Sequence, residues 1–193
     1  MDPVYCYPDT DVLINKLHIR DKNRLRDAEK KLVNLRVFDL IERPAKGGFD
    51  FAHLQKIHGY LFQDLYDWAG KIRTVDIAKG NMFCRVPFIQ TQADNIFRKL
   101  KAEHYLKGLS QEEFPAKLAW YFSEINALHP FREGNGRSQR EFIRELALYH
   151  NYKILFSRTE EEELLKASID SFLCRYKKME QVFRKCLVKP DGR

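Results

Sequence analysis

The chain has 193 residues, of which 44% are hydrophobic and 13% aromatic, so it can bury the core of one domain and does not resemble a disordered protein. Its four cysteines lack zinc-site spacing, and no apolar run approaches the roughly 20 residues that cross a membrane, which excludes zinc-finger and transmembrane proteins. The formal charge of +7 suits anionic partners, although the basic residues are spread along the chain as on an ordinary soluble surface.

The first residues lack the pattern of a secretion signal. We therefore expect a cytoplasmic protein with reduced thiols, or one that leaves the cytoplasm by a route without an N-terminal signal.

The first part of the chain predicts two helices, over residues 21–41 and 50–68. Apolar side chains recur three or four positions apart, at Leu25, Ala28, Leu32 and Leu35 in the first segment and at Leu54, Ile57, Leu61, Leu65 and Trp68 in the second. Asp50 is the expected N-cap of the second helix, and Ala69-Gly70 is its expected end.

The pattern changes between residues 72 and 89. Residues 72–77 alternate and are rich in β-branched side chains, residues 79–81 resemble a turn, and residues 83–89 are again extended. This order predicts a β-hairpin, in which Pro87 would confine the second strand to a sheet edge. A lone hairpin is only marginally stable, so we expect it to pack against the helices.

The rest of the chain predicts five more helices and neither an internal repeat nor a linker. They cover residues 91–106, 111–128, 137–150, a segment that begins at Thr159, and 176–187. Thr159 followed by Glu162 is expected to form a capping box. The sequence therefore predicts a mainly helical fold with one hairpin.

Residues 129–140, here called the signature segment, collect the residue types that phosphate binding needs. Gly134 and Gly136 bracket Asn135 immediately before a predicted helix, where backbone N–H groups can turn toward a ligand and the helix presents its positive end. Arg137 and Arg140 are three positions apart, so we expect them to share a face of the first helical turn, and guanidinium groups match phosphate oxygens.

Two further residues complete this segment. Glu133 lies at the mouth of the loop, where its carboxylate could hold a magnesium ion bound to phosphates. His129 precedes the loop and is a candidate general base. Each of these residues alone is more often structural, but one loop does not need all of them for its structure, so together they indicate phosphoryl or nucleotidyl transfer.

The signature segment resembles the signature of the Fic family, His-Pro-Phe-x-[Asp/Glu]-Gly-Asn-Gly-Arg-x-x-Arg, at every fixed position. Residues 61–73 and 75–77 also resemble the family's stretch that leads into its flap. The resemblance implies the Fic fold, an all-α helical bundle with one β-hairpin flap over the active site. It implies a single domain over residues 1–193, with a core at about 50–155 and flanking N- and C-terminal helices.

The activity that the resemblance implies is protein adenylyltransfer, in which ATP with Mg²⁺ donates AMP to a Tyr, Ser or Thr hydroxyl of a target protein. His129 would deprotonate that hydroxyl, Phe131 would anchor the loop in the core, and Glu133 would bind Mg²⁺. The intact acidic residue and Gly-Asn-Gly-Arg run favour AMP over the phosphate transferred by relatives with altered loops, without excluding another nucleotide.

The remaining site residues follow from the same resemblance. Gly134, Asn135 and Gly136 would hold the phosphates, with Arg137 on the β-phosphate and Arg140 on the γ-phosphate. Lys79 is a candidate contact for nucleotide or target, with a solvated turn lysine as the alternative. The flap would clamp the target by strand pairing through the set Val75, Ile77, Phe83 and Val86.

Many Fic proteins carry an inhibitory helix with the pattern [Ser/Thr]-x-x-x-Glu-[Gly/Asn], whose Glu pairs with the second signature arginine. Here only Thr159 is followed by a correctly spaced Glu163, and Leu164 then breaks the pattern. The chain thus resembles the class with a separate inhibitor. We hypothesise a bacterial toxin that a small helical antitoxin silences with a Glu near Arg140, and whose targets are type II topoisomerases, DNA gyrase or topoisomerase IV.

Other functions are weighed against this one. A P-loop NTPase is excluded because GxxxxGK[ST] is missing, and no zinc-finger or RNP motif supports direct nucleic-acid binding. The remaining alternatives are a secreted effector that acts in a host cell and transfer of a different nucleotide or phosphate group.

Overall fold

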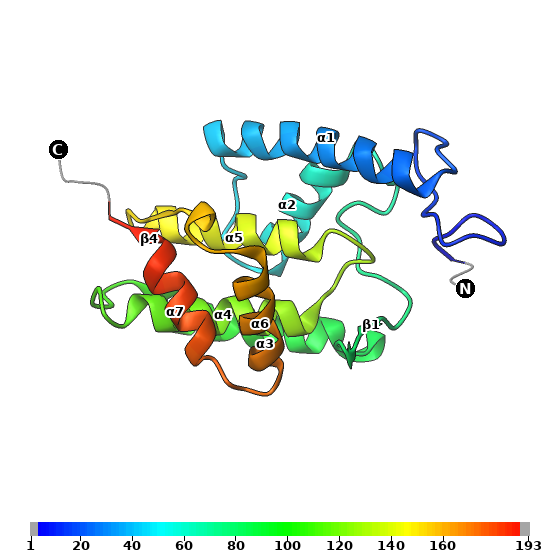
Figure 1. Cartoon of the computed structure of the whole chain (residues 1–193). Coiled ribbons are helices and arrows are strands. Elements are labelled where there is room, and N and C mark those ends of the chain that lie inside the picture. The colour runs from blue at the N-terminus through cyan, green and yellow to red at the C-terminus, as the bar shows by residue number, and fades with distance from the viewer. Residues whose placement is uncertain (1–3, 190–193) are drawn as a thin grey trace.

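The structure is a computed structural model that describes residues 4–189. Helices dominate it (Figure 1). The α-helices are α1 (Lys22–Glu42), α2 (Phe51–Phe62), α3 (Ile89–Ala102), α4 (Phe114–Leu128), α5 (Asn135–Tyr149), α6 (Glu161–Phe172) and α7 (Lys177–Cys186). Two short antiparallel strand pairs complete it, β1 (Ala78–Lys79) with β2 (Asn81–Met82) and β3 (Lys153–Ile154) with β4 (Leu187–Val188).

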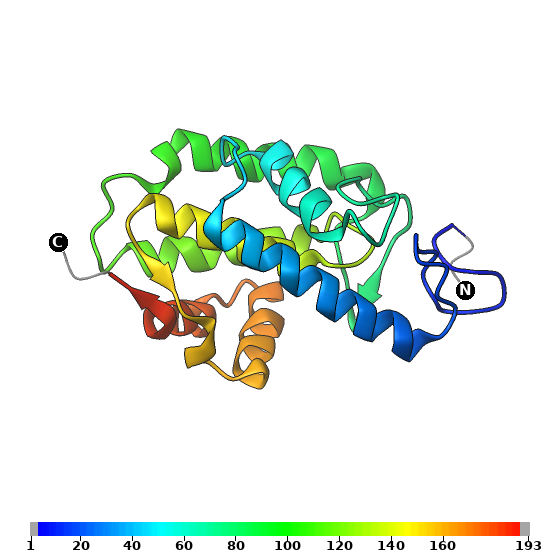
Figure 2. The same cartoon turned by 90° about the horizontal axis from the view of Figure 1, so that it is seen from above.

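Helices α4 and α5 lie side by side in the middle of the molecule (Figure 2). Helix α5 also packs against α2, and α4 packs against α3, α6 and α7. Helix α1 crosses the outside of α2 as an outer layer (Figure 1). The core between these layers consists of fully buried apolar side chains such as Leu118, Phe142, Ile143 and Leu146, so α4 and α5 present their shared end, the signature segment, from a rigid support.

The predicted helical bundle is confirmed, but α2 is shorter than expected. It ends at Phe62 rather than Trp68, and hydrogen-bonded turns follow it. Leu65 stays buried in these turns, and the rings of Tyr66 and Trp68 stack with centroids 4.3 Å apart. The apolar spacing of a helix therefore continues past Phe62 because these side chains pack into the core from turns.

The hairpin is also shorter than predicted. Its strands pair Ala78 with Met82 across Gly80, and residues 86–88, which include Pro87, form a 3-10 helix instead of an edge strand. Side-chain hydrogen bonds replace the missing strand pairing. Asp76 accepts the N–H of Val86 at 2.8 Å, and the buried Arg73 side chain donates to the carbonyls of Val75 and Cys84, one on each arm of the hairpin.

Helix caps give one confirmed prediction and one correction. Asp50 caps α2 by accepting the N–H of His53 at 2.8 Å, as expected. The capping box at Thr159 is wrong, because Glu160 is the N-cap of α6 and the Thr159 hydroxyl donates to Glu163 instead. A reciprocal pair of this kind forms before α4, where Ser110 and Glu113 accept each other's N–H at 3.2 and 3.1 Å.

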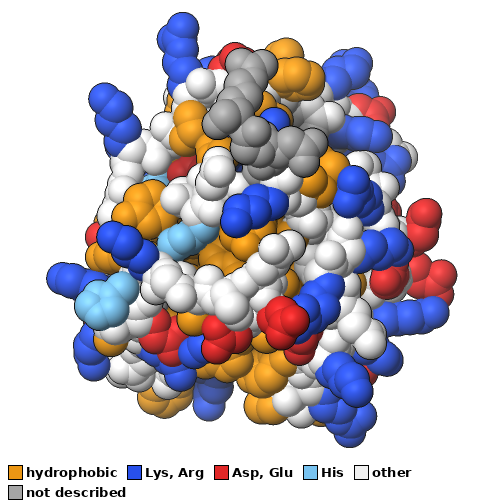
Figure 3. All heavy atoms as spheres, turned by 90° about the vertical axis from the view of Figure 1, so that its left-hand side faces the viewer, with side chains coloured by type: hydrophobic (Ala, Val, Ile, Leu, Met, Phe, Trp, Pro, Cys, Tyr) orange, Lys and Arg blue, Asp and Glu red, His pale blue; other side chains and the backbone are white. Residues whose placement is uncertain are grey.

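The surface agrees with a dispersed charge. On the face in Figure 3, Lys and Arg side chains alternate with acidic and apolar ones. Within residues 4–189 no helix has the length and apolar content needed to cross a membrane.

Candidate active site

The signature segment leaves α4 at His129 and enters α5 at Asn135. His129 adopts a left-handed conformation (φ 45°) that ends α4, and Phe131 then inserts into the core, where its ring is fully buried. The Asn135 amide closes the loop, since it accepts the N–H of Phe131 at 2.9 Å and donates to the carbonyl of Phe131 at 2.7 Å. The loop shape is thus fixed from within.

Gly134 is required where it stands. Its φ is +79°, and a Cβ there would meet the ring of Phe62 at 2.1 Å. It precedes α5, and no described side chain caps that helix end, so the first backbone N–H groups of α5, at Asn135 and Gly136, are available as anion donors. A Cβ on Gly136 would make only ordinary contact with Arg140, so the turn itself does not require this second glycine. The missing side chain leaves space beside the start of α5.

The His129 ring is held in one tautomer. Its Nδ1 lies 3.2 Å from the carbonyl of Asn126, and because a carbonyl only accepts, Nδ1 carries the hydrogen and Nε2 carries the lone pair. Burial, the largest cause, lowers the pKa of His129 to about 4. The imidazole is therefore neutral at physiological pH and can accept a proton at Nε2.

Phe83 of the flap, residues 75–88, lies on this histidine. The two rings stack with centroids 3.6 Å apart, and Phe83 also meets Phe172 of α6 edge-on at 5.2 Å. The Phe83 side chain is buried against the site and is not exposed to a target. Docking of a target at Phe83 stays a prediction, and it would involve the backbone of this residue.

Arg73 ties the flap to the signature segment, a role that sequence reasoning missed. The side chain is fully buried; Nε donates to the carbonyl of His129 at 2.9 Å, Nη1 to that of Val75 at 2.7 Å, and Nη2 to that of Cys84. Its backbone N–H donates to the carbonyl of Pro130 at 2.9 Å. One side chain thus positions both arms of the flap and the backbone of the candidate base.

His58 on α2 is a second support that sequence reasoning missed. Its Nδ1 accepts the N–H of Gly70 at 2.8 Å, so Nε2 carries the hydrogen and donates to the carbonyl of Glu133 at 2.9 Å. Its ring stacks on Phe131 with centroids 3.8 Å apart. Burial lowers the pKa of His58 to about 4, so this histidine is also neutral, but both nitrogens are engaged in holding the loop.

The two signature arginines leave α5 toward different surroundings, although three-residue spacing suggested one shared face. Arg137 contacts Glu29 of α1 at 2.5 Å and lies over the ring of Phe62 at 4.7 Å. It also comes within 3.7 Å of the Glu133 carboxylate.

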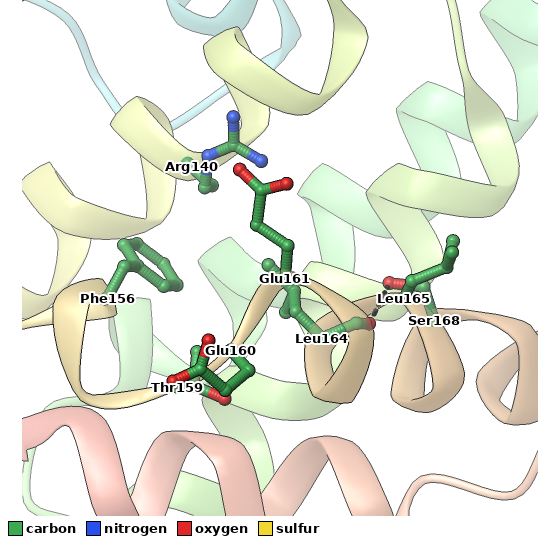
Figure 4. A pocket seen from close by; sticks show the side chains of 8 residues that line it. All are labelled: Arg140, Phe156, Thr159, Glu160, Glu161, Leu164, Leu165 and Ser168. Atoms are coloured by element: carbon green, nitrogen blue, oxygen red, sulfur yellow. Dashed lines mark hydrogen bonds between the residues drawn. The ribbon is translucent and has the colours of Figure 1, made fainter.

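Arg140 instead lines a cavity of about 440 Å³ between α5 and α6, together with Phe156, Thr159, Glu160, Glu161, Leu164, Leu165 and Ser168. The Glu161 carboxylate points toward the Arg140 guanidinium (Figure 4). Burial, and then the charge of Arg137, lowers the pKa of Arg140, while Glu161 opposes that shift. A partly desolvated guanidinium beside an open cavity of this size suits an anionic group of a small ligand.

Glu133 is the candidate metal ligand, and its surroundings fit a metal that arrives with a nucleotide. The carboxylate accepts the N–H of Gly134 at 2.9 Å, and 36% of the Glu133 side chain is exposed. No three His, Cys, Asp or Glu side chains within residues 4–189 gather into a metal-binding group. Magnesium commonly binds through one or two carboxylates, substrate phosphates and water, which one exposed carboxylate beside an anion site can satisfy.

The other flap residues lie where a target could reach them. Lys79 is exposed at the end of β1, and Val75, Ile77 and Val86 are half-buried along the flap. The positive charge of Lys79 contributes to lowering the pKa of His129, which places the lysine near the site without assigning it a contact.

Comparison with known proteins gives the family. The sequence model of the Fic/DOC family matches residues 48–147. The protein adenylyltransferase VbhT of Bartonella schoenbuchensis is 42% identical over 97% of this chain, and the chain spans 39% of VbhT. The probable protein adenylyltransferase Fic of Escherichia coli K12 is 36% identical over 95% of this chain and 91% of its own length.

A solved structure agrees with these relatives. The Bartonella tribocorum BepC protein, a VirB-translocated effector with bound AMPPNP, superposes with a TM-score of 0.93 at 26% identity and covers 99% of both chains. The fold predicted from the resemblance is confirmed. The chain belongs to the Fic/DOC family.

Proposed function

We propose that this chain transfers AMP from ATP to a hydroxyl group of a target protein. The hydroxyl oxygen forms a bond to the α-phosphorus, the bond between the α-phosphorus and the bridging oxygen to the β-phosphate breaks, and diphosphate leaves. The hydroxyl proton passes to Nε2 of His129.

The observation that carries this proposal is the neutral, oriented ring of His129 near the N-terminus of α5. The Asn126 carbonyl holds the hydrogen on Nδ1, and burial keeps the ring neutral, so Nε2 is a ready base. Immediately beyond it, none of the side chains that the structure describes caps the helix N-terminus at Gly134, which leaves N–H donors for an anion. A base next to an anion site is the arrangement that phosphoryl and nucleotidyl transfer require.

The remaining residues of the segment have complementary roles in this proposal. The loop at Gly134, Asn135 and Gly136 holds the phosphates through the N–H groups of residues 135 and 136, because the Gly134 N–H donates to Glu133. Arg137 stabilises the β-phosphate, and Arg140 binds the γ-phosphate at the cavity beside α6. Glu133 would hold Mg²⁺, and the bound ion would supply positive charge to offset that of the diphosphate. The relatives' names and the AMPPNP bound to BepC support ATP as the nucleotide.

The flap gives the proposal its target site. Val75, Ile77 and Val86 lie along the arms with part of their surface exposed, and Lys79 is at the tip. An extended target segment would pair with this edge and bring its hydroxyl toward His129.

The test uses ATP labelled at the α- or the γ-phosphate, with Mg²⁺ and bacterial lysate, and compares the wild type with His129→Ala. Label from the α-position on protein, only with the wild type, supports AMP transfer. Label from the γ-position instead identifies a kinase, and no transfer from either position contradicts the proposal when the preparation contains no co-purified inhibitor.

We further propose that the chain is the toxin of a bacterial toxin–antitoxin pair that works in the cytoplasm. Thr159 and Glu163 bond to each other and Glu163 pairs with Lys185, so this pair does not supply an inhibitory contact to Arg140. A small helical antitoxin would insert a Glu beside Arg140. Its targets would be DNA gyrase or topoisomerase IV, so purified topoisomerase subunits should accept α-label, and harmless expression of the active chain alone would count against the toxin role.

The similarity to BepC favours one other setting, a secreted effector that acts inside a host cell. Label that appears on host-cell proteins but not on bacterial ones would favour this alternative. Competition with unlabelled CTP, GTP and UTP distinguishes AMP from another nucleotide.

A further inference from the structure

Helix α1 lies outside the residues that the family model matches, yet one of its side chains reaches the signature segment. Glu29 uses both carboxylate oxygens: Oε1 accepts from Arg137 Nη2 at 2.5 Å, and Oε2 accepts from the Tyr66 hydroxyl at 2.5 Å. Only 14% of the Glu29 side chain is exposed. A carboxylate so placed interacts strongly with the arginine, because water screens the pair little.

A second carboxylate competes for the same arginine. The same Nη2 of Arg137 lies 3.7 Å from Oε1 of Glu133, which is the candidate metal ligand. The ring of Phe62 supports the guanidinium from beneath but provides no directional acceptor. Without Glu29, the nearest carboxylate to Arg137 is that of Glu133, and an ion pair there would occupy the oxygens that a cation needs.

We propose that Glu29 is a positioning residue that holds Arg137 away from Glu133 and so keeps the Glu133 carboxylate available to the magnesium–nucleotide complex. This inference rests on the proposed function for its ligand. It assigns α1 a role in the site: the helix sets the orientation of the first signature arginine through one side chain, 108 positions away in sequence.

The chain offers a matched control on the same helix. Arg36 of α1 pairs with Asp64, with Nε and Nη2 at 2.7 and 2.9 Å from its carboxylate. This pair also ties α1 to the segment after α2, but it does not involve the signature segment. Asp64→Asn therefore removes an ion pair of α1 without touching Arg137 or Glu133.

The experiment measures binding of AMPPNP by calorimetry, with and without Mg²⁺, to the wild type, Glu29→Gln and Asp64→Asn, and follows the thermal unfolding of each. In the wild type, Mg²⁺ should increase the affinity for AMPPNP. In Glu29→Gln we expect this increase to be smaller by about 10- to 100-fold, as when a group that orients a metal ligand is removed. Asp64→Asn should keep the wild-type tightening. Glu29→Asp, which keeps the charge but shortens its reach, should lose tightening in the same direction and serves if Glu29→Gln does not fold.

The role of Glu29 would be overturned if Mg²⁺ increased the AMPPNP affinity of Glu29→Gln or Glu29→Asp as much as that of the wild type. It would also be overturned if Asp64→Asn lost as much of this increase as Glu29→Gln. These outcomes leave the proposed function intact if the wild type still transfers α-label. A wild type that binds AMPPNP equally with and without Mg²⁺ and transfers no label removes both proposals together.

Discussion

The signature segment and the flap meet at His129, but they are held in different ways. The segment closes on itself through the Asn135 amide on Phe131 and the positive φ of Gly134, and Arg73 and His58 donate to its carbonyls from outside. The flap has only two residue pairs of strand and depends on a buried arginine from outside it. The candidate catalytic loop therefore has hydrogen bonds of its own, whereas the flap has little regular structure and depends on a few side-chain hydrogen bonds.

Two glycines with the same φ give the sharpest contrast. Gly134 and Gly80 both have φ +79°, but only at Gly134 would a Cβ meet other atoms, at 2.1 Å from the Phe62 ring. We expect Gly134→Ala to lower the free energy of unfolding by about 2–4 kcal/mol, from backbone strain and overpacking together. Gly80→Ala carries only the backbone strain, about 1 kcal/mol. Chemical denaturation measures both, and equal losses would show that the two regions are not held differently.

Removal of the arginine should separate the two regions. Arg73→Met leaves the carbonyls of His129, Val75 and Cys84 without their donor, and we expect a loss of about 1–3 kcal/mol together with faster proteolysis in the flap. Arg85→Met is the control, because Arg85 is exposed in the same flap and its only ion pair within residues 4–189 is with Asp76 at the surface. If flap cleavage rises equally in both variants, Arg73 is not the anchor.

The pH profile tests the state of the histidine at which the regions meet. The free-enzyme base with a pKa of about 4 stays deprotonated down to that pH, so kcat/KM for AMP transfer should show no histidine limb near pH 6.5. An ordinary histidine would lose about tenfold in neutral base by pH 5.5. NMR titration of the His129 ring, assigned with His129→Ala, provides the direct reading, and protonation near pH 6.5 would contradict the burial argument.

Stability should follow the same histidines. His129 and His58 have folded-state pKa values of about 4, below the unfolded value near 6.5, so the unfolded chain binds more protons between these values. The free energy of unfolding should therefore fall as the pH drops from about 6.5 toward 4. Above about pH 6.5 these two histidines should not make the free energy of unfolding depend on pH. Replacement of His58 by Gln should weaken this pH dependence, and an unchanged slope would show that His58 is not responsible.

The smallest expected effect is at the flap tip. Lys79→Ala should change the free energy of unfolding by less than about 0.5 kcal/mol, because Lys79 is exposed at the end of the short strand β1. Its charge contributes to the low pKa of His129, so the variant should raise that pKa slightly. A transfer rate reduced far more than the pKa change explains would identify Lys79 as a direct contact to nucleotide or target.

Sequence reasoning succeeded where the structure depends on neighbouring residues. The glycines, Asn135 and the start of α5 form one local unit, and helix periodicity located the bundle. It failed at supports that come from far along the chain: Arg73 and His129 are 56 positions apart, His58 and Glu133 are 75 apart, and Glu29 and Arg137 are 108 apart. The same applies to the flap, where Arg73 and Asp76 satisfy backbone groups that a longer hairpin would have paired.

The central claim is that His129 is the base for AMP transfer. Its most direct test is the initial rate of α-label transfer from ATP to protein by the wild type and by His129→Ala, with thermal unfolding to verify that the variant is folded. The expected result is a loss of about 10²- to 10⁴-fold in the folded variant, the usual contribution of a positioned general base. Equal rates for the two proteins would contradict the assignment.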